Sequence, residues 1–188
     1  MSPVDATALA AVVPVVGWSA HSGFLTRRLA TARRDPLTDL PTRAAFTARA
    51  SRLLAKSPNA VVLLVDLDDF KAVNDTYGHD AGDAVLTATA QRLALWAGPH
   101  GIAARLGGDE FAAAVPDLAR TPGPRALGWA LNQPVTHHGT RLPVGASAGF
   151  CHRYDLPVPD LSAALTLADA AMYADKGRGR RGRRNTHN

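Results

Sequence analysis

Apolar residues along the 188-residue chain form short continuous runs and helical repeats, separated by turn signals. The run Ala60–Leu67 is rich in valine and ends in acidic residues, which predicts a buried central strand. Ile102–Leu106 and Phe111–Val115 flank a double glycine. They predict a hairpin, because a tight turn needs the positive φ that glycine adopts without strain. Leu142–Phe150 predicts a further strand.

Other segments have apolar residues at helical spacing. Ala44–Leu54, Asp80–Ala97 and Leu161–Lys176 predict helices, and a shorter one is expected at Ala126–Leu131. Their expected core positions are Phe46, Leu53, Leu54, Val85, Leu86, Leu93, Leu95, Leu161, Leu165, Ala168 and Met172. The order of elements predicts an α+β fold of the ferredoxin-like type, with a sheet that carries helices on one face.

The N-terminal segment has no Asp, Glu, Lys or Arg between Ala6 and Phe24, and arginines follow. This pattern permits two interpretations. One is a membrane anchor with a positive cytoplasmic flank, although Pro14 and Gly17 interrupt a stretch that is short for the ~20 residues of a span. The other is a helix that packs on the domain or on a second copy of the chain.

Asp35-Pro36 then marks a boundary, because Asp35 can cap a helix that Pro36 starts. The expected divisions are an N-terminal helical segment 1–34, a domain 35–181 and a basic disordered tail 182–188.

Composition describes a globular chain, with 46% hydrophobic and 20% charged residues and a net charge of +5. A single cysteine, Cys151, excludes an internal disulfide and favours a reducing compartment. Lysine is confined to Lys56, Lys71 and Lys176, and the one glutamate is Glu110. The positions of residue types this scarce are candidates for chemistry. His137, His138 and His152 form no metal motif with Cys151.

Three acids follow the first predicted strand: Asp66, Asp68 and Asp69. Turn formation is the ordinary explanation for Asp68 and Asp69. Asp66 stands directly at the end of the apolar run, where an unpaired charge is costly and a bound cation would offset the cost. An EF-hand loop is excluded, because Phe70 and Lys71 stand where it needs an acid and a glycine.

A second acidic pair, Asp109-Glu110, follows Gly107-Gly108 in the predicted hairpin. If the hairpin strand pairs beside the Asp66 strand, Asp66 and Asp109 converge. Two carboxylates and a phosphate suit Mg²⁺, which prefers oxygen ligands. Glycines without side chains would let an anion approach the backbone. A turn without chemistry explains the hairpin motif equally well when it is taken alone.

The motifs together are more specific than any one of them. They read DPLTDL at 35–40 with Arg43, DLDDFK at 66–71, NDTYGHDAGD at 74–83, RLGGDEF at 105–111, and Ala168-Asp169 with YADK at 173–176 and Gly179-Arg180. In this order and spacing, the segment from Asp35 to Arg181 resembles the GGDEF diguanylate cyclases. The resemblance implies a nucleotidyl-cyclase-type fold, a mostly antiparallel central sheet flanked by helices.

The resemblance also implies roles. Asp66, Asp109 and the Leu67 carbonyl would bind Mg²⁺, with Mn²⁺ as the alternative. Gly107, Gly108, Asp109 and Glu110 would form the catalytic hairpin, in which Glu110 either deprotonates the 3′-hydroxyl of GTP or orients metal or water. Substrate would be bound by Phe70, Lys71, Asn74, Asp83, Lys176 and Arg180. Among these, Asn74 and Asp83 would read guanine, and Lys71, Lys176 and Arg180 would hold phosphates.

The implied reaction joins two GTP molecules into cyclic di-GMP and pyrophosphate across a homodimer. We expect a cytoplasmic protein, free or attached to the inner face of the membrane, without specific nucleic acid. Gly98 and Gly101 stand where many relatives carry an Arg-x-x-Asp product-inhibition site, so we expect no inhibition through it. The alternatives are a non-catalytic module that binds GTP or cyclic di-GMP, an RNA-binding domain, and a cyclase of mixed dinucleotides.

Overall fold

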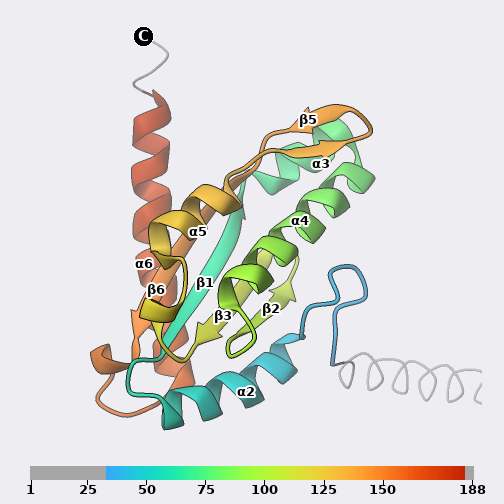
Figure 1. Ribbon diagram of the computed structural model, residues 1–188. Helices are drawn as coiled ribbons and strands as arrows, with labels where there is room; N and C mark the ends of the chain where they lie inside the picture. The colour runs from blue at the N-terminus through green and yellow to red at the C-terminus, as the bar shows by residue number, and fades with distance from the viewer. Residues whose placement is uncertain (1–32, 185–188) are drawn as a thin grey trace, which may run out of the picture. The chain divides into compact units, whose positions relative to one another are not determined.

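The computed structural model describes residues 33–184, with side chains described as far as Lys176 (Figure 1). Its helices are α2 (Arg43–Lys56), α3 (Phe70–Tyr77), α4 (His79–Ala97), α5 (Gly123–Leu131) and α6 (Leu161–Arg184). Its strands are β1 (Val61–Asp68), β2 (Ile102–Gly107), β3 (Glu110–Val115), β4 (Val135–His137), β5 (Thr140–Leu142) and β6 (Gly145–His152). The predictions for the N-terminal segment 1–34 fall almost wholly outside the described residues.

The central sheet has the order β2-β3-β1-β6, and each neighbouring pair is antiparallel. β1 is central, as its apolar run predicts, with Val65 opposite Phe111 on β3 and opposite Ala148 on β6. The α+β class, the hairpin and the helices expected at 44–54, 80–97, 126–131 and 161–176 are confirmed.

Helices cover both faces of the sheet, which corrects the expectation of helices on one face. Leu63 and Val65 of β1 belong to the core that contains Leu93 of α4, whereas Val62 belongs to the core that contains Phe46 of α2. In Figure 1, α4 crosses one face of the sheet, and α6 lies on the other. Because β1 is apolar on both sides, each face must be covered.

The sequence patterns missed the helix α3 and the β4–β5 hairpin. α3 is only eight residues long, with Val73 as its buried residue, so its few apolar positions are too short a pattern to reveal it. The β4–β5 hairpin turns at His138 and Gly139, which have φ of 46° and 77°. The single strand expected at Leu142–Phe150 is wrong at its start, since β5 ends at Leu142 and β6 begins at Gly145. Pro143 stands between them and has no N–H for a strand ladder.

Two smaller predictions are also wrong. Pro36 starts a turn rather than a helix, and the Asp35 carboxylate accepts hydrogen bonds from the Thr38 amide at 2.9 Å and hydroxyl at 2.7 Å. Leu95 is 82% exposed. It is two positions after the buried Leu93, and a separation of two positions places side chains on opposite sides of a helix. Leu53 and Leu165 are half-buried, and the remaining core positions are buried.

The backbone of α6 lies directly on β6. A Cβ at Gly149 would collide with the Ala168 carbonyl and the Met172 amide, so only glycine permits this approach. Asp160 precedes the helix, and its carboxylate accepts hydrogen bonds from the amides of Ser162 at 3.0 Å and Ala163 at 3.3 Å. Both features fix the position of α6, which carries Lys176.

No helix within the described residues is both long and apolar enough to cross a bilayer. The apolar stretch from Ala6 to Phe24 lies outside these residues.

Candidate functional site

The glycine-rich turn joins β2 to β3, with Gly107 at a φ of 147° and Gly108 at 51°. A residue with a side chain would be strained in these conformations. The β2–β3 register shifts between Arg105 and Gly107, so the strand is irregular as it enters the turn. The turn presents Asp109 and Glu110 at one end of the sheet.

Strand pairing brings the two predicted acidic groups together, as expected if the hairpin lies beside the Asp66 strand. Asp66 on β1 is directly opposite Glu110 on β3, and the Leu67 amide donates to the Asp109 carbonyl at 3.3 Å. Residues directly opposite in an antiparallel pair have side chains on the same face. Asp66 and Glu110 therefore share a face, and Asp109 adjoins both through the backbone.

Lys176 of α6 reaches this end of the sheet. Its Nζ lies 2.6 Å from Oδ1 of Asp66, and the two side chains are only 31% and 20% exposed. The ion pair offsets the free-energy cost of placing the Asp66 charge at the end of an apolar strand. It also shows that the Asp66 carboxylate attracts a cation.

Glu110 has a looser partner. Nη2 of Arg43 lies 3.5 Å from its Oε2, with more than half of each side chain exposed. A pocket of about 140 Å³ opens beside this pair on the α2 and α6 face, and it is lined by Arg43, Leu64, Val65, Leu106, Glu110, Leu165, Asp169 and Met172. Glu110 is thus exposed, and its contact with Arg43 is at the long limit of a hydrogen bond.

The second part of the candidate site lies on the α3–α4 helix pair. Asn74 on α3 is half-buried and rests against Gly82 of α4, where a Cβ would collide with its side-chain oxygen. The same Cβ would lie 3.2 Å from Cζ of Phe70. Asp83, the next residue of α4, is exposed, so its carboxylate is open to a ligand. The absence of a side chain at Gly82 thus makes room for Asn74.

The remaining predicted substrate residues lie on the same elements. Lys71 is exposed on the first turn of α3. The backbone at Arg180 is helical, which meets the condition that it and Lys176 share a face of one helix. The side chain of Arg180 lies outside the described side chains.

The donors suit Mg²⁺ only in part. Asp66, Asp109 and the Leu67 carbonyl supply hard oxygen atoms at one end of the sheet. Among the described residues, no group of three or more His, Cys, Asp or Glu side chains is placed to hold a metal ion. Mg²⁺ normally keeps waters and substrate phosphates as its other ligands, so the residues fit a metal that arrives with a triphosphate.

Arg105 is a supporting residue that the predicted site omitted, although it begins the RLGGDEF motif. It bonds the carbonyl of Gly108 and the carboxylate of Asp35. Burial raises the pKa of Asp35, but hydrogen bonds from Thr38 and then from Arg105 outweigh it and keep the pKa below its usual value.

The Arg-x-x-Asp positions of the resemblance lie between α4 and β2. Gly98 ends α4 with a φ of 66°, outside the range that side chains favour. A Cβ at Gly101 would lie 2.5 Å from the Ala97 carbonyl oxygen and 2.9 Å from that of Ala114. The backbone here leaves no room for a carboxylate side chain without rearrangement.

Comparison with known proteins relates this architecture to one family. Residues 32–182 match the family described as "Diguanylate cyclase, GGDEF domain". A protein of Streptomyces ambofaciens, described as an uncharacterized 19.3 kDa protein in repSA 5'region, is 57% identical over 181 residues. The alignment covers 96% of this chain and 98% of that relative.

Diguanylate cyclase DgcN of Escherichia coli (strain K12) is 37% identical over 158 residues, which are 79% of this chain and 38% of DgcN. The match thus covers a minor part of that longer protein. Among solved structures, the GGDEF domain of DgcB from Caulobacter crescentus, in complex with c-di-GMP, superposes with a TM-score of 0.64 and 29% identity. This superposition covers 78% of the chain and 89% of the DgcB domain.

Proposed function

Since this chain belongs to the GGDEF family of diguanylate cyclases, we propose that it condenses two GTP molecules into cyclic di-GMP and releases two molecules of pyrophosphate. The observation that carries the proposal is the register that sets Asp66 opposite Glu110, with Lys176 bound to Asp66. Two acids and a lysine at one end of a sheet, beside a glycine turn, are suited to nucleotidyl transfer from a triphosphate.

Guanine would lie on the α3–α4 pair. The Asp83 carboxylate accepts hydrogen bonds from N1 and N2 of guanine, and the Asn74 amide binds the same edge. Adenine lacks this pair of donors, so an adenine base that covered Asp83 from water would leave the carboxylate unpaired, which is how a polar site rejects the wrong base. Phe70 and Lys71 begin α3, which a single residue separates from the end of β1, and connect this base site to the hairpin.

The phosphates would lie over the hairpin turn. Lys71, Lys176 and Arg180 supply positive charge, and Gly107 and Gly108 let the phosphate approach the backbone. Bound Mg²⁺, or Mn²⁺, would be held by Asp66, Asp109 and the Leu67 carbonyl and would neutralise charge that develops on the phosphate oxygens. Lys176 would then pass from the Asp66 carboxylate to a phosphate, because both are anionic acceptors.

In the bond-forming step, the 3′-oxygen of one GTP attacks the α-phosphorus of the other. The new P–O bond replaces the bond to pyrophosphate, which leaves, and the hydroxyl proton is transferred to a base. We assign that role to Glu110, because it is half-exposed and its partner Arg43 lies as far as 3.5 Å away. In a second such step the two nucleotides exchange roles, which closes the ring and releases the second pyrophosphate.

Each chain carries one set of these residues and binds one GTP molecule, so the reaction needs two copies of the chain. The active form is therefore a homodimer whose hairpins face one another, at least during turnover. We also propose that the enzyme lacks product inhibition through the Arg-x-x-Asp positions, because Gly98 and Gly101 stand there and the backbone excludes a side chain at Gly101.

The test is to incubate the purified chain with GTP and Mg²⁺ at rising protein concentration and to separate the products. We expect cyclic di-GMP and pyrophosphate, a rate per chain that rises with concentration, and no activity in Asp109→Ala. ATP should give no cyclic product. GTP binding without cyclic di-GMP at the highest concentration would instead identify a non-catalytic binding module.

A further inference from the structure

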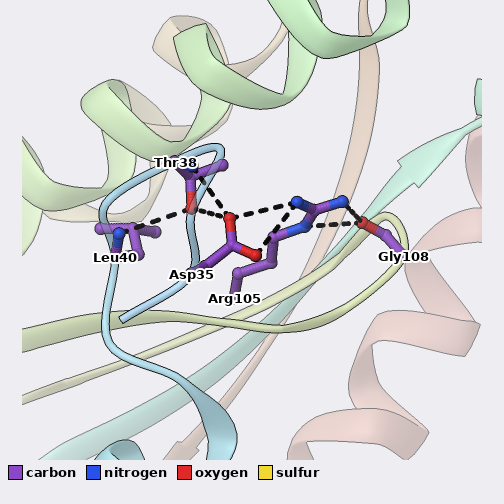
Figure 2. A network of polar contacts seen from close by, with 5 residues as sticks. All are labelled: Asp35, Thr38, Leu40, Arg105 and Gly108. Carbon is purple, nitrogen blue, oxygen red and sulfur yellow. Dashed lines mark hydrogen bonds and ion pairs between the residues drawn. The ribbon is translucent and has the colours of Figure 1, made fainter. Parts of the chain in front are cut away.

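Arg105 bridges two parts of the chain that are far apart in sequence (Figure 2). Its Nε and Nη2 donate to the Gly108 carbonyl at 2.9 and 2.7 Å. Its Nη1 donates to both carboxylate oxygens of Asp35 at 3.1 and 3.3 Å. The side chains of Arg105 and Asp35 are 14% and 20% exposed, so the ion pair is shielded from water.

These contacts use the planar geometry of a guanidinium group. One edge, Nε and Nη2, holds a single carbonyl oxygen, while the remaining nitrogen is directed at the carboxylate. A lysine ammonium has three donors around a single atom and no rigid plane, so it cannot hold both acceptors in this arrangement. The positive charge alone is therefore insufficient.

The bond to Gly108 fixes the peptide that leads into Asp109. In a trans peptide the C=O and the following N–H point in opposite directions. With the Gly108 carbonyl directed at Arg105, the Asp109 amide is turned the other way. Glycines at 107 and 108 restrict the backbone little, so the orientation of this peptide depends on a contact from outside the turn.

Asp35 is itself held by a compact turn at the start of the described domain. Its amide donates to the Leu40 carbonyl at 2.8 Å, and its carboxylate accepts from Thr38. The backbone of Arg105 joins the same segment, because its amide donates to the Pro41 carbonyl at 3.1 Å. The clamp formed by Asp35, Arg105 and Gly108 thus has a rigid base.

We propose that Arg105 is a positioning residue for cyclisation, which orients the Gly108–Asp109 peptide while Asp35 holds its guanidinium in place. The inference rests on the proposed cyclase activity and adds a role to residues outside the predicted site. It also means that the chain is fastened to the catalytic turn at the point where it enters the domain.

The test compares Arg105→Lys with Arg92→Lys in the full chain. Arg92 is a matched control, because its guanidinium donates to the carbonyls of Gln133 at 2.7 Å and Pro134 at 3.1 Å, away from the hairpin. We expect Arg105→Lys to lower kcat by about 10- to 100-fold, since small misplacements of reacting groups have effects of this order. KM for GTP should change far less.

Two further readouts separate positioning from folding. Hydrogen exchange of the amides at 107–110 should accelerate in Arg105→Lys and not in Arg92→Lys, whose kcat should match that of the parent. In Arg105→Ala, added guanidinium ion below denaturing concentration should restore part of kcat. Asp35→Asn should also lower kcat and accelerate exchange at 107–110, but by less, because Arg105 keeps its bonds to Gly108.

Failure of the Arg105 proposal can be distinguished from failure of the proposed cyclase function. If the parent makes no cyclic di-GMP, the cyclase proposal fails, and hydrogen exchange still tests whether Arg105 orders the turn. An active parent with an unchanged kcat in Arg105→Lys would overturn the inference. So would an equal loss of kcat in Arg92→Lys, because that result would assign the effect to stability.

Discussion

The two parts of the proposed site, the hairpin end of the sheet and the α3–α4 pair, are held by different kinds of contact. At the hairpin end, cross-strand register sets Asp66 opposite Glu110, and Lys176 adds an ion pair at 2.6 Å. On the helix pair, Asn74 is placed by shape, against a glycine without a Cβ. A sheet can therefore fix reacting groups through its backbone, whereas a helix pair can select a base through the space it leaves.

This comparison predicts that damage to the hairpin end lowers kcat, and that damage to the helix pair raises KM and relaxes base selectivity.

The largest effect is expected from Asp66→Ala. Loss of a preorganised charge at a reacting phosphate typically lowers kcat by about 10²–10³-fold. Stability should change by about 1 kcal/mol, because the variant loses both the ion pair and the largely buried Asp66 charge, and the flexible Lys176 side chain can turn toward solvent. Steady-state kinetics and urea unfolding measure the two quantities, with the exposed Asp175→Ala as control. A variant that keeps its kcat would remove Asp66 from the mechanism.

The next effect is expected from Gly149→Ala. The added methyl group would collide with the backbone of α6 at Ala168 and Met172, so α6 must move and carry Lys176 with it. We expect a loss of about 3 kcal/mol in unfolding free energy. Gly128→Ala is the matched control, because Gly128 is helical with open space around it and should be neutral or stabilised. Equal stability of the two variants would contradict the close α6–β6 contact.

A smaller effect is expected from Gly82→Ala, which tests the helix-pair part alone. The methyl group would displace Asn74, and the loss of a polar contact to the base corresponds to about 1–3 kcal/mol of binding. KM for GTP should rise while kcat changes little. The preference for GTP over inosine triphosphate, which lacks the N2 amine, should fall. A loss of kcat with selectivity intact would show that Asn74 does not read the base.

The smallest effect is expected from Asp35→Asn, measured as stability against pH. The pKa of Asp35 is lowered from 3.8 in the folded chain, so the folded state favours the carboxylate more than the unfolded state does. Its contribution, about 1 kcal/mol, is present above that value and is lost as pH falls through the folded pKa. The free energy of unfolding should be larger for the parent than for the variant at neutral pH, and this difference should shrink below about pH 4. A difference that stays constant down to pH 2 would exclude the Asp35 charge as its cause.

Local patterns were sufficient for most of the fold. The continuous apolar run of β1, the glycine-centred hairpin and the helical repeats of α2, α4 and α6 were each visible in a single segment. α3 was missed because a short helix with one buried residue leaves little pattern. The faces of the sheet were misjudged because the pattern of β1 shows burial on both sides without showing what covers them.

The sequence by itself determined the family, the order of the longer elements and the residues with candidate chemistry, because these depend on motifs and local spacing. Only the tertiary structure decided that Lys176 meets Asp66, which lies 110 positions away, and that Arg105 meets Asp35, 70 positions away. Such pairs depend on strand register and on how closely α6 approaches β6. Local patterns contain neither quantity, because register and approach are set by packing between segments that are distant along the chain.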